Sequence, residues 1–533
     1  MQGLNMDVPL LVSDMIEHAA TWHAQTQIVA RDLNGSVVKY TYAEADRRAR
    51  QLAQALARLG VRRGDVCASL AWNTRQHFEL FYGISGSGAV LHTINPRLFA
   101  EQIVFIANDA EDAWIFCDAG TLPLVESIAG DLPQIRGWIY MDEGTDLPAS
   151  SLPLLCYEEL LAAESGDYAW PVLDERHAAT ICYTSGTTGN PKGVVYSNRS
   201  ATLSSLYMSL ADMIGGYTPG SLEVVMPVAP LFHGNGWQMV YTAPMNGHKL
   251  VLPGRNFEPQ SLLQLILEEG VTMAAAVPTV WIGLVEHARA SGSGFGSLRA
   301  ALVAGSRPPD TLIDQLEDEF GVHVAQTWGM TEGLGVGKAS IPPAENRSGN
   351  EERNLQRRQG RVAFGTRYRL LDEEGREQPF DGEAVGQLHM RGPTVAGSYL
   401  GREPNDGWLD TGDIARLHPD GSLELVDRAK DVIKSGGEWI STLEMESAAV
   451  EHADVLMAAV ISIPHPKWQE RPMLVVVPRE GRHVDSDDLM AFLETRIAKW
   501  WLPDKIVELA ELPLTGTGKV NKRALKESLK INN

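Results

Sequence analysis

The stretch that decides the fold is TICYTSGTTGNPKGVV, residues 180–195. An apolar run leads into a segment of glycine, serine and threonine, which ends at Lys192 before a second apolar run. Glycines let backbone N–H groups approach phosphate oxygens, hydroxyls add short donors, and a lysine adds a mobile positive charge. The stretch therefore predicts a phosphate-binding loop rather than an ordinary polar turn. A Walker A loop is a poor fit, because Gly193 stands where that pattern requires serine or threonine.

Around this loop, short apolar runs alternate with helical patterns. Residues 41–59 repeat apolar positions at helical spacing, with Thr41 as the N-cap and Gly60 as the stop. This rhythm favours parallel α/β layers over a β-sandwich. The pattern predicts further helices at 75–83, 100–107, 261–269 and 310–320, and strands at 66–70, 89–92, 114–117, 273–277 and 300–303.

The sequence pattern changes after about residue 360. Turn pairs separate short alternating runs at 368–371, 387–390 and 423–426, which predicts a small antiparallel sheet. Beyond 427–431, the runs at 441–451, 455–463, 474–477 and 486–499 predict a compact α+β unit. We therefore expect an α/β protein in three parts. Residues 1–427 form a large N-terminal domain of layered α/β subdomains plus the small antiparallel β subdomain, residues 428–431 a hinge, and residues 432–533 a small mobile α+β domain.

Composition excludes several classes of protein. The net charge of -22 disfavours nucleic acid, since binding to phosphate backbones rests on lysine and arginine. No run of eighteen apolar residues, secretory signal or peroxisomal tail is present, so we expect a cytoplasmic protein without a membrane span. The four cysteines, Cys67, Cys117, Cys156 and Cys182, are widely spaced and are expected to be reduced and mostly buried.

At this point the sequence becomes recognisable. Residues 183–193 resemble the signature loop of the adenylate-forming superfamily, which includes acyl-CoA synthetases, adenylation domains and luciferases. Segments 92–97, 328–332 and 427–441 resemble bacterial medium-chain fatty acyl-CoA ligases and 3-methylmercaptopropionyl-CoA ligases most closely. The resemblance covers nearly the whole chain and implies ATP and Mg²⁺, with coenzyme A as the co-substrate.

The resemblance also implies roles for individual residues. Glu332 and Thr184 would hold Mg²⁺, and Asp413, in what we expect to be a short acid turn at 410–413, would accept the ribose hydroxyls. His233, Trp237, Ala304, Gly305, Trp328 and Gly329 would line the acyl pocket, which Ala304 narrows. The ATP contacts would come from Thr184, Ser185, Gly186, Thr187, Thr188, Gly189, Lys192, Gly305, Ser306, Arg307, Thr327, Trp328, Gly329, Met330, Thr331, Asp413 and Arg428.

The catalytic set implied by the family is Lys519, Glu332 and His233. Lys519 would bridge carboxylate and phosphate oxygens during adenylation. We expect His233 to gate the acyl pocket rather than act as a general base, because a carboxylate nucleophile is already ionised at neutral pH.

Two half-reactions compete for one space, because adenylation needs Lys519 in the site and thioester formation needs room for the pantetheine arm. We therefore expect a domain swing about Lys430. The coenzyme A side would use Lys434, Gly436, Gly437, Trp439 and Glu470.

The predicted function is an ATP-dependent acyl-CoA ligase for short- or medium-chain fatty acids or 3-methylmercaptopropionate. A ligase for an aromatic acid such as cinnamate is one alternative. From other classes, a luciferase-like oxygenase or a catalytically dead binding protein of the same fold also remain open. The expected partners are small molecules, with a homodimer as an open alternative.

Overall fold

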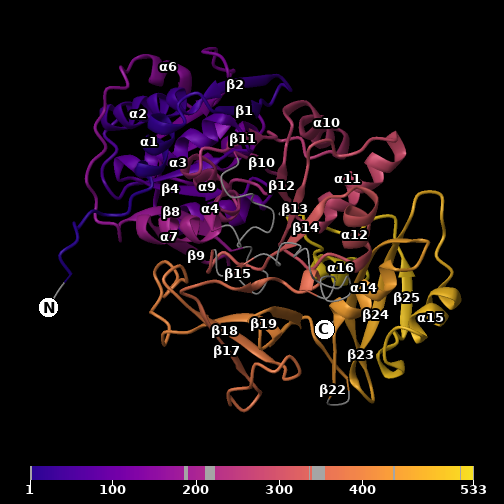
Figure 1. The fold of residues 1–533 in the computed structure, drawn as a ribbon. Helices are drawn as coiled ribbons and strands as arrows, with labels where there is room; N and C mark the ends of the chain where they lie inside the picture. Colours follow the sequence, from indigo (N-terminus) through magenta and orange to yellow (C-terminus); the bar gives the residue numbers. More distant parts are fainter. Residues whose placement is uncertain are drawn as a thin grey trace.

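The computed structural model describes residues 3–184, 190–210, 222–334, 337–338, 355–435, 438–516 and 518–531. Large α/β layers form the upper part of the molecule, and the small sheet and the C-terminal domain lie below them (Figure 1). The mixed α/β architecture, with a large N-terminal part and a smaller α+β part, confirms the predicted fold class.

The phosphate-binding stretch lies at one edge of a seven-stranded sheet. The strand order is β7-β6-β5-β3-β4-β8-β9, and only β9 runs antiparallel to its neighbour. The predicted loop therefore joins the last two strands as a hairpin. The strands are β3 (Val66–Leu70), β4 (Val90–Ile94), β5 (Asp112–Asp118), β6 (Gly137–Met141), β7 (Leu154–Cys156), β8 (Ala178–Tyr183) and β9 (Gly193–Ser197).

A second seven-stranded sheet has the order β14-β13-β12-β10-β11-β1-β2. It is parallel except for the β1–β2 hairpin. Its strands are β1 (Gln27–Arg31), β2 (Val37–Thr41), β10 (Val224–Pro227), β11 (Lys249–Leu252), β12 (Met273–Ala276), β13 (Ala300–Val303) and β14 (His323–Gln326).

Helices fill the space between the two sheets and cover their outer faces. The central helices carry the largest buried cluster, which takes side chains from both sheets. They are α1 (Ser13–Trp22), α2 (Tyr42–Arg58), α3 (Arg75–Ser87), α6 (Tyr157–Ala162), α7 (Asn198–Ser209) and α9 (Met239–Met245). The outer faces are covered by α4 (Ala100–Asp109) and α5 (Leu122–Ile128) on the first sheet, and by α10 (Pro259–Glu269), α11 (Pro278–Ser291) and α12 (Asp310–Asp314) on the second.

A four-stranded antiparallel sheet follows, in the order β17-β18-β19-β20. Its buried side chains pack around Trp328, so this sheet supports one wall of the site. Its strands are β17 (Arg367–Leu371), β18 (Gly386–Arg391), β19 (Leu409–Leu417) and β20 (Leu423–Arg428). The short strands β15 (Gly337–Lys338) and β16 (Arg361–Val362) pair beside it.

The described residues of the C-terminal part form a five-stranded sheet with three α-helices. The strand order is β22-β21-β24-β23, and β25 pairs with β24. The elements are β21 (Ile433–Ser435), β22 (Glu438–Ile440), α14 (Thr442–Val450), β23 (Val455–His465), β24 (Gln469–Pro478), α15 (Ser486–Glu494), β25 (Lys505–Glu508) and α16 (Lys522–Ser528). Among the helices of the described residues, none has the length and apolar character needed to cross a bilayer.

Most predicted elements are present, and three differ in ways that matter. Thr41 caps α2 through a complete capping box with Glu44. The helix predicted at 310–320 changes after Asp314 into a π-helical turn, and the run at 486–499, predicted as part of the α+β unit, contains a helix that ends at Glu494. The acid turn expected at 410–413 was wrong, because these residues lie within β19.

Candidate active site

The hairpin that carries the predicted phosphate-binding loop is closed at its base by paired hydrogen bonds. Tyr183 pairs with Gly193 at the last position of the ladder. Thr184 N–H then donates to the Lys192 carbonyl at 3.0 Å, and Lys192 N–H donates to Thr184 Oγ1 at 3.2 Å. Ser185, Gly186, Thr187, Thr188 and Gly189 lie outside the described residues, so their predicted contacts stay predictions.

Tyr183 fixes the hairpin to the sheet below it. Its hydroxyl donates to Asp109 at 2.7 Å, and its ring lies 5.0 Å from the His92 ring. His92 is fully buried and pairs with buried Asp112 at 2.9 Å. A side chain on Gly193 would collide with the Tyr183 ring, with its Cβ 2.9 Å from Cζ, so glycine is required there. The motif residue at 92 is thus a structural support beneath the loop.

The segment after β14 carries several of the predicted ATP contacts and the predicted metal residue Glu332. The Thr327 hydroxyl donates to the Gly337 carbonyl at 3.1 Å, and the Thr331 carbonyl accepts from the Tyr196 hydroxyl at 2.5 Å. Glu332 is 7% exposed, and its Oε1 accepts from the Tyr399 hydroxyl at 2.7 Å. Gly329 is exposed, and Met330 and Thr331 are partly buried. Sequence reasoning missed Tyr399, which lies 67 residues from Glu332 along the chain.

Asp413 is aimed by a bulge in β19. Opposite Leu388 of β18, three residues of β19 stand between the pairs Gln387–Ile414 and His389–Asp410, and Gly412 has φ +69°. A bulge re-aims side chains, and this one directs Asp413 inward, where it is 2% exposed. Residues 411–413 have no strand-pairing partner on β18, and this local irregularity explains why the pattern at 410–413 gave no strand signal.

Two donors hold the Asp413 carboxylate. Trp328 Nε1 donates to Oδ2 at 3.0 Å, and Arg428 Nε contacts Oδ1 at 2.8 Å. Burial raises the pKa of Asp413 above its ordinary value, and the Arg428 charge opposes that rise. A carboxylate offers about four acceptor positions, so room for further donors remains. Trp328 also packs in the core of the small sheet, 6.0 Å from the Tyr368 ring.

Lys519 reaches this site from the C-terminal domain. Its Cε lies 3.1 Å, and its Nζ 3.9 Å, from where a Cβ on Gly305 would stand. Gly305 has φ +91°, so glycine here permits both the backbone turn and the close approach of the lysine. Burial, together with Arg428, lowers the pKa of Lys519 to about 8, while Asp413 opposes the shift.

Contacts between domains hold the lysine segment in place. Thr279 Oγ1 donates to the Gly518 carbonyl at 2.9 Å, and Arg97 donates to the Gly516 carbonyl at 3.0 Å. Further out, Glu286 of α11 pairs with Arg479 at 2.8 Å. Arg307 contacts Asp310 at 3.5 Å, and Ser306 and Ala304 complete the turn after β13, with Ala304 only 7% exposed.

His233 precedes a left-handed turn, α8 (Gly234–Trp237), in which Asn235 and Trp237 have positive φ, as does Gln238 just after it. Such strain persists only where the surroundings enforce it. Asn235 Nδ2 donates to Thr180 Oγ1 at 3.2 Å, and Gln238 Oε1 accepts from Ser204 at 2.9 Å. Burial and the nearby charge of Lys519 lower the pKa of His233 to about 3, so it is neutral at pH 7 and a poor base.

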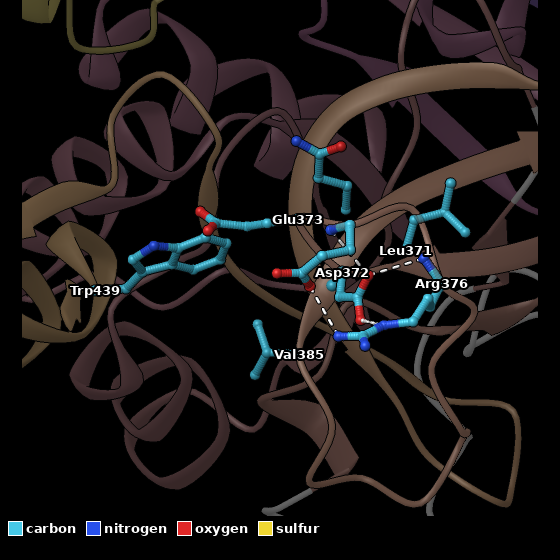
Figure 2. Close-up of a pocket in the computed structure, with 9 residues that line it drawn as sticks. Leu371, Asp372, Glu373, Arg376, Val385 and Trp439 are labelled. Carbon is cyan, nitrogen blue, oxygen red and sulfur yellow. Dashed lines mark hydrogen bonds and ion pairs between the residues drawn. The ribbon is translucent and has the colours of Figure 1, made fainter. Parts of the chain in front are cut away.

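The predicted coenzyme A residues lie together, but not beside Lys519. Lys434 N–H donates to Glu470 at 3.0 Å, and its Nζ pairs with Glu373 at 3.3 Å. Trp439 lines a cavity of about 350 Å³ with residues of the small sheet, and Figure 2 shows its indole beside Glu373. In Figure 1, β22 lies at the lower edge of the molecule, well separated from β9. Gly436 and Gly437 lie outside the described residues.

Comparison with known proteins identifies the family. Residues 16–400 match the AMP-binding enzyme family, and residues 444–519 match the AMP-binding enzyme C-terminal domain. The chain belongs to the AMP-binding enzyme family.

Two relatives in the family match over almost their full length. The chain is 43% identical to a 3-methylmercaptopropionyl-CoA ligase of Ruegeria lacuscaerulensis, covering 99% of each chain. It is 40% identical to a medium-chain-fatty-acid–CoA ligase of Ectopseudomonas oleovorans, covering 99% of this chain and 97% of the other. These names confirm the enzyme class predicted from the sequence, an AMP-forming acid–thiol ligase, over the oxygenase and the inactive binding protein.

The fold is shared with a solved structure of the anthranilate CoA ligase AuaEII in complex with anthranoyl-AMP. The TM-score is 0.86 at 22% identity, and the match covers 99% of both chains. At this identity, the likeness bears on the fold alone.

Proposed function

We propose that the chain joins a short- or medium-chain aliphatic acid, such as a fatty acid or 3-methylmercaptopropionate, to coenzyme A through an acyl-adenylate. The names of the two relatives support this substrate class. The observation that carries the mechanism is the placement of Lys519 against Gly305, beside Asp413 and Arg428.

In the first half-reaction, a carboxylate oxygen attacks the α-phosphorus of ATP and diphosphate leaves. Two anions approach each other in this step, so the site must supply positive charge and hold the geometry. Lys519 would screen both anions, Lys192 would bind phosphate oxygens, and Asp413 would accept the ribose hydroxyls. His233, which is neutral, would shape the mouth of the acyl pocket beside Trp237.

The residues present fit a magnesium ion bound mainly through the nucleotide. Among the described residues no group of three or more His, Cys, Asp or Glu forms a metal cluster, and Glu332 offers one carboxylate. Mg²⁺ commonly binds through one or two carboxylates, substrate phosphates and waters. Bound there with Thr184 nearby, it would neutralise charge on the phosphates.

In the second half-reaction, the coenzyme A sulfur attacks the acyl carbon and AMP leaves. We propose that the C-terminal domain turns about 428–431 to bring Lys434, Trp439 and Glu470 to the thiol path. Lys430 is exposed, and it lies between the end of β20 at Arg428 and the start of β21 at Ile433. The cytoplasmic location and the homodimer stay predictions.

A panel of acids tests this proposal. Purified enzyme should release diphosphate and consume coenzyme A with aliphatic acids of about three to twelve carbons and with 3-methylmercaptopropionate, and cinnamate should react more slowly. Turnover of cinnamate but of none of the aliphatic acids would refute the proposed substrate class. Failure to form an acyl-adenylate from any acid would refute the function.

A further inference from the structure

One short segment of the chain is bonded to both halves of the nucleotide site. In residues 396–400, the Ala396 N–H donates to the Glu332 carbonyl at 2.7 Å, and the Leu400 N–H donates to the Gly193 carbonyl at 2.8 Å. The segment therefore spans from the predicted metal carboxylate to the strand that leaves the phosphate-binding hairpin.

Tyr399, within this segment, contacts the charged group on each side. Its hydroxyl donates to Glu332 Oε1 at 2.7 Å, and the Lys192 ammonium lies 4.8 Å from the centre of its ring. A tyrosine hydroxyl keeps its proton at neutral pH, so it is available as a donor to the carboxylate. The ring packs against a buried cluster that includes Cys182 and Val194.

The two charged groups do not neutralise each other. Lys192 and Glu332 are both described, and they form no ion pair with each other. A direct pair would occupy the lysine and the carboxylate at once, and a nucleotide would have to break it. The tyrosine between them gives each a weaker partner, a cation–π contact on one side and a neutral hydrogen bond on the other.

We propose that Tyr399 is a positioning residue for the nucleotide and its divalent cation: its hydroxyl orients Glu332 and its ring places Lys192. The proposal rests on the roles proposed above for these two residues. It assigns the tyrosine no contact with the reacting atoms. Groups that orient a metal ligand commonly change metal affinity or activity by about 10–100-fold when they are removed.

The test separates the hydroxyl from the ring. Tyr399→Phe removes only the donor, and Tyr399→Leu removes both contacts. Binding of Mn²⁺ in the presence of a non-hydrolysable ATP analogue is measured by electron paramagnetic resonance, together with the KM for ATP at saturating Mg²⁺. The matched control is Tyr140→Phe, since the Tyr140 hydroxyl also contacts a carboxylate, Asp142 at 3.2 Å, outside the site.

Tyr399→Phe should weaken Mn²⁺ binding about 10-fold and change the KM for ATP much less. Tyr399→Leu should weaken Mn²⁺ binding and raise the KM for ATP. Tyr140→Phe should change neither quantity. Wild-type Mn²⁺ affinity in Tyr399→Phe would overturn the inference, as would an equal loss in Tyr140→Phe.

Variants of Glu332 and Lys192, the two anchors that Tyr399 contacts, separate failure of the inference from failure of the proposed function. If Glu332→Gln and Lys192→Ala lose adenylation while Tyr399→Phe binds Mn²⁺ like the wild type, only the inference fails. If both anchor variants keep wild-type adenylation, the proposed site itself is wrong and the inference falls with it.

Discussion

Two loops of the C-terminal domain, the Lys519 segment and the β21–β22 hairpin, lie against different parts of the N-terminal domain. The segment around Lys519 lies inside the nucleotide site, against Gly305 and bonded to Thr279 through Gly518. The β21–β22 hairpin, which carries Lys434 and Trp439, lies against the small sheet beside Glu373. One loop is in place for chemistry on the nucleotide, and the other lies apart from it.

We propose that this arrangement serves the adenylation half-reaction. Lys519, the lysine proposed to screen charge, lies in the proposed nucleotide site, and the proposed thiol-path residues lie outside it, as adenylation would require. The cross-domain ion pairs are partly exposed: Glu286 and Arg479 at 41% and 26%, and Glu373 and Lys434 at 62% and 56%. Exposed pairs contribute about 0–1 kcal/mol each, so these contacts are weak enough to break during a domain swing.

The largest expected effect comes from Lys519→Ala. Loss of a group that stabilises transition-state charge typically costs about 10²–10³ in rate, and adenylation should fall by that amount. Thioester formation from preformed acyl-adenylate should stay within about threefold of the wild type, since the lysine is not needed once the adenylate exists. The two rates are measured by diphosphate release and by coenzyme A consumption. An equal fall in the adenylation and thioester rates would contradict the assignment of Lys519 to adenylation.

Gly305→Ala should also impair adenylation. It would crowd Lys519 sterically rather than remove its charge. The new Cβ would stand 3.1 Å from Lys519 Cε and 3.0 Å from Val277, at a φ of +91°. Strain of about 1–3 kcal/mol corresponds to roughly 5–150-fold, which should appear mainly in adenylation.

Gly375→Ala is the matched control for Gly305→Ala. Its φ is +78°, but nothing lies within 4 Å of the added Cβ. It should lower thermal stability and leave the ratio of the half-reactions unchanged. A change in that ratio equal to that of Gly305→Ala would show that backbone strain, not the approach of the lysine, sets the effect.

The pH dependence should also separate the two half-reactions. The pKa of Lys519 is lowered to about 8, so the ammonium is present below pH 8 and is lost as the pH rises through that value. The kcat/KM of adenylation for ATP, which reports the free enzyme, should fall roughly tenfold by about pH 9. Thioester formation from preformed adenylate should lack this alkaline limb. Lys519→Arg keeps its charge and should remove the limb; a limb that persists would assign the titration to another group.

The smallest expected effect comes from Glu373→Gln. The change removes the exposed pair with Lys434 and loosens the hairpin from the small sheet. Adenylation should stay unchanged, and the thioester step should rise by no more than about threefold, as expected for an exposed pair. Stopped-flow rates at low and high salt measure this effect. A tenfold fall in adenylation would mean that the pair does more than hold the hairpin.

Local patterns predicted the layered α/β fold, since Thr41, the alternating runs and the turn pairs each act within a few residues. Features made by distant contacts escaped prediction. The β19 bulge that aims Asp413 breaks the strand pattern, and the left-handed turn after His233 uses Asn235, Trp237 and Gln238 rather than only glycines. Tyr399 carries no local signal, because Lys192 and Glu332 meet it only in three dimensions.

We propose that this arrangement makes the adenylate and must rearrange to make the thioester. Glu286 and Arg479 lie on different domains, 2.8 Å apart, and all four native cysteines are buried. A short bismaleimide can therefore join Glu286→Cys to Arg479→Cys selectively. Single-turnover measurements on the cross-linked enzyme should show diphosphate release near the uncross-linked rate, with thioester formation reduced more than about 100-fold. Thioester formation at the uncross-linked rate would contradict the account.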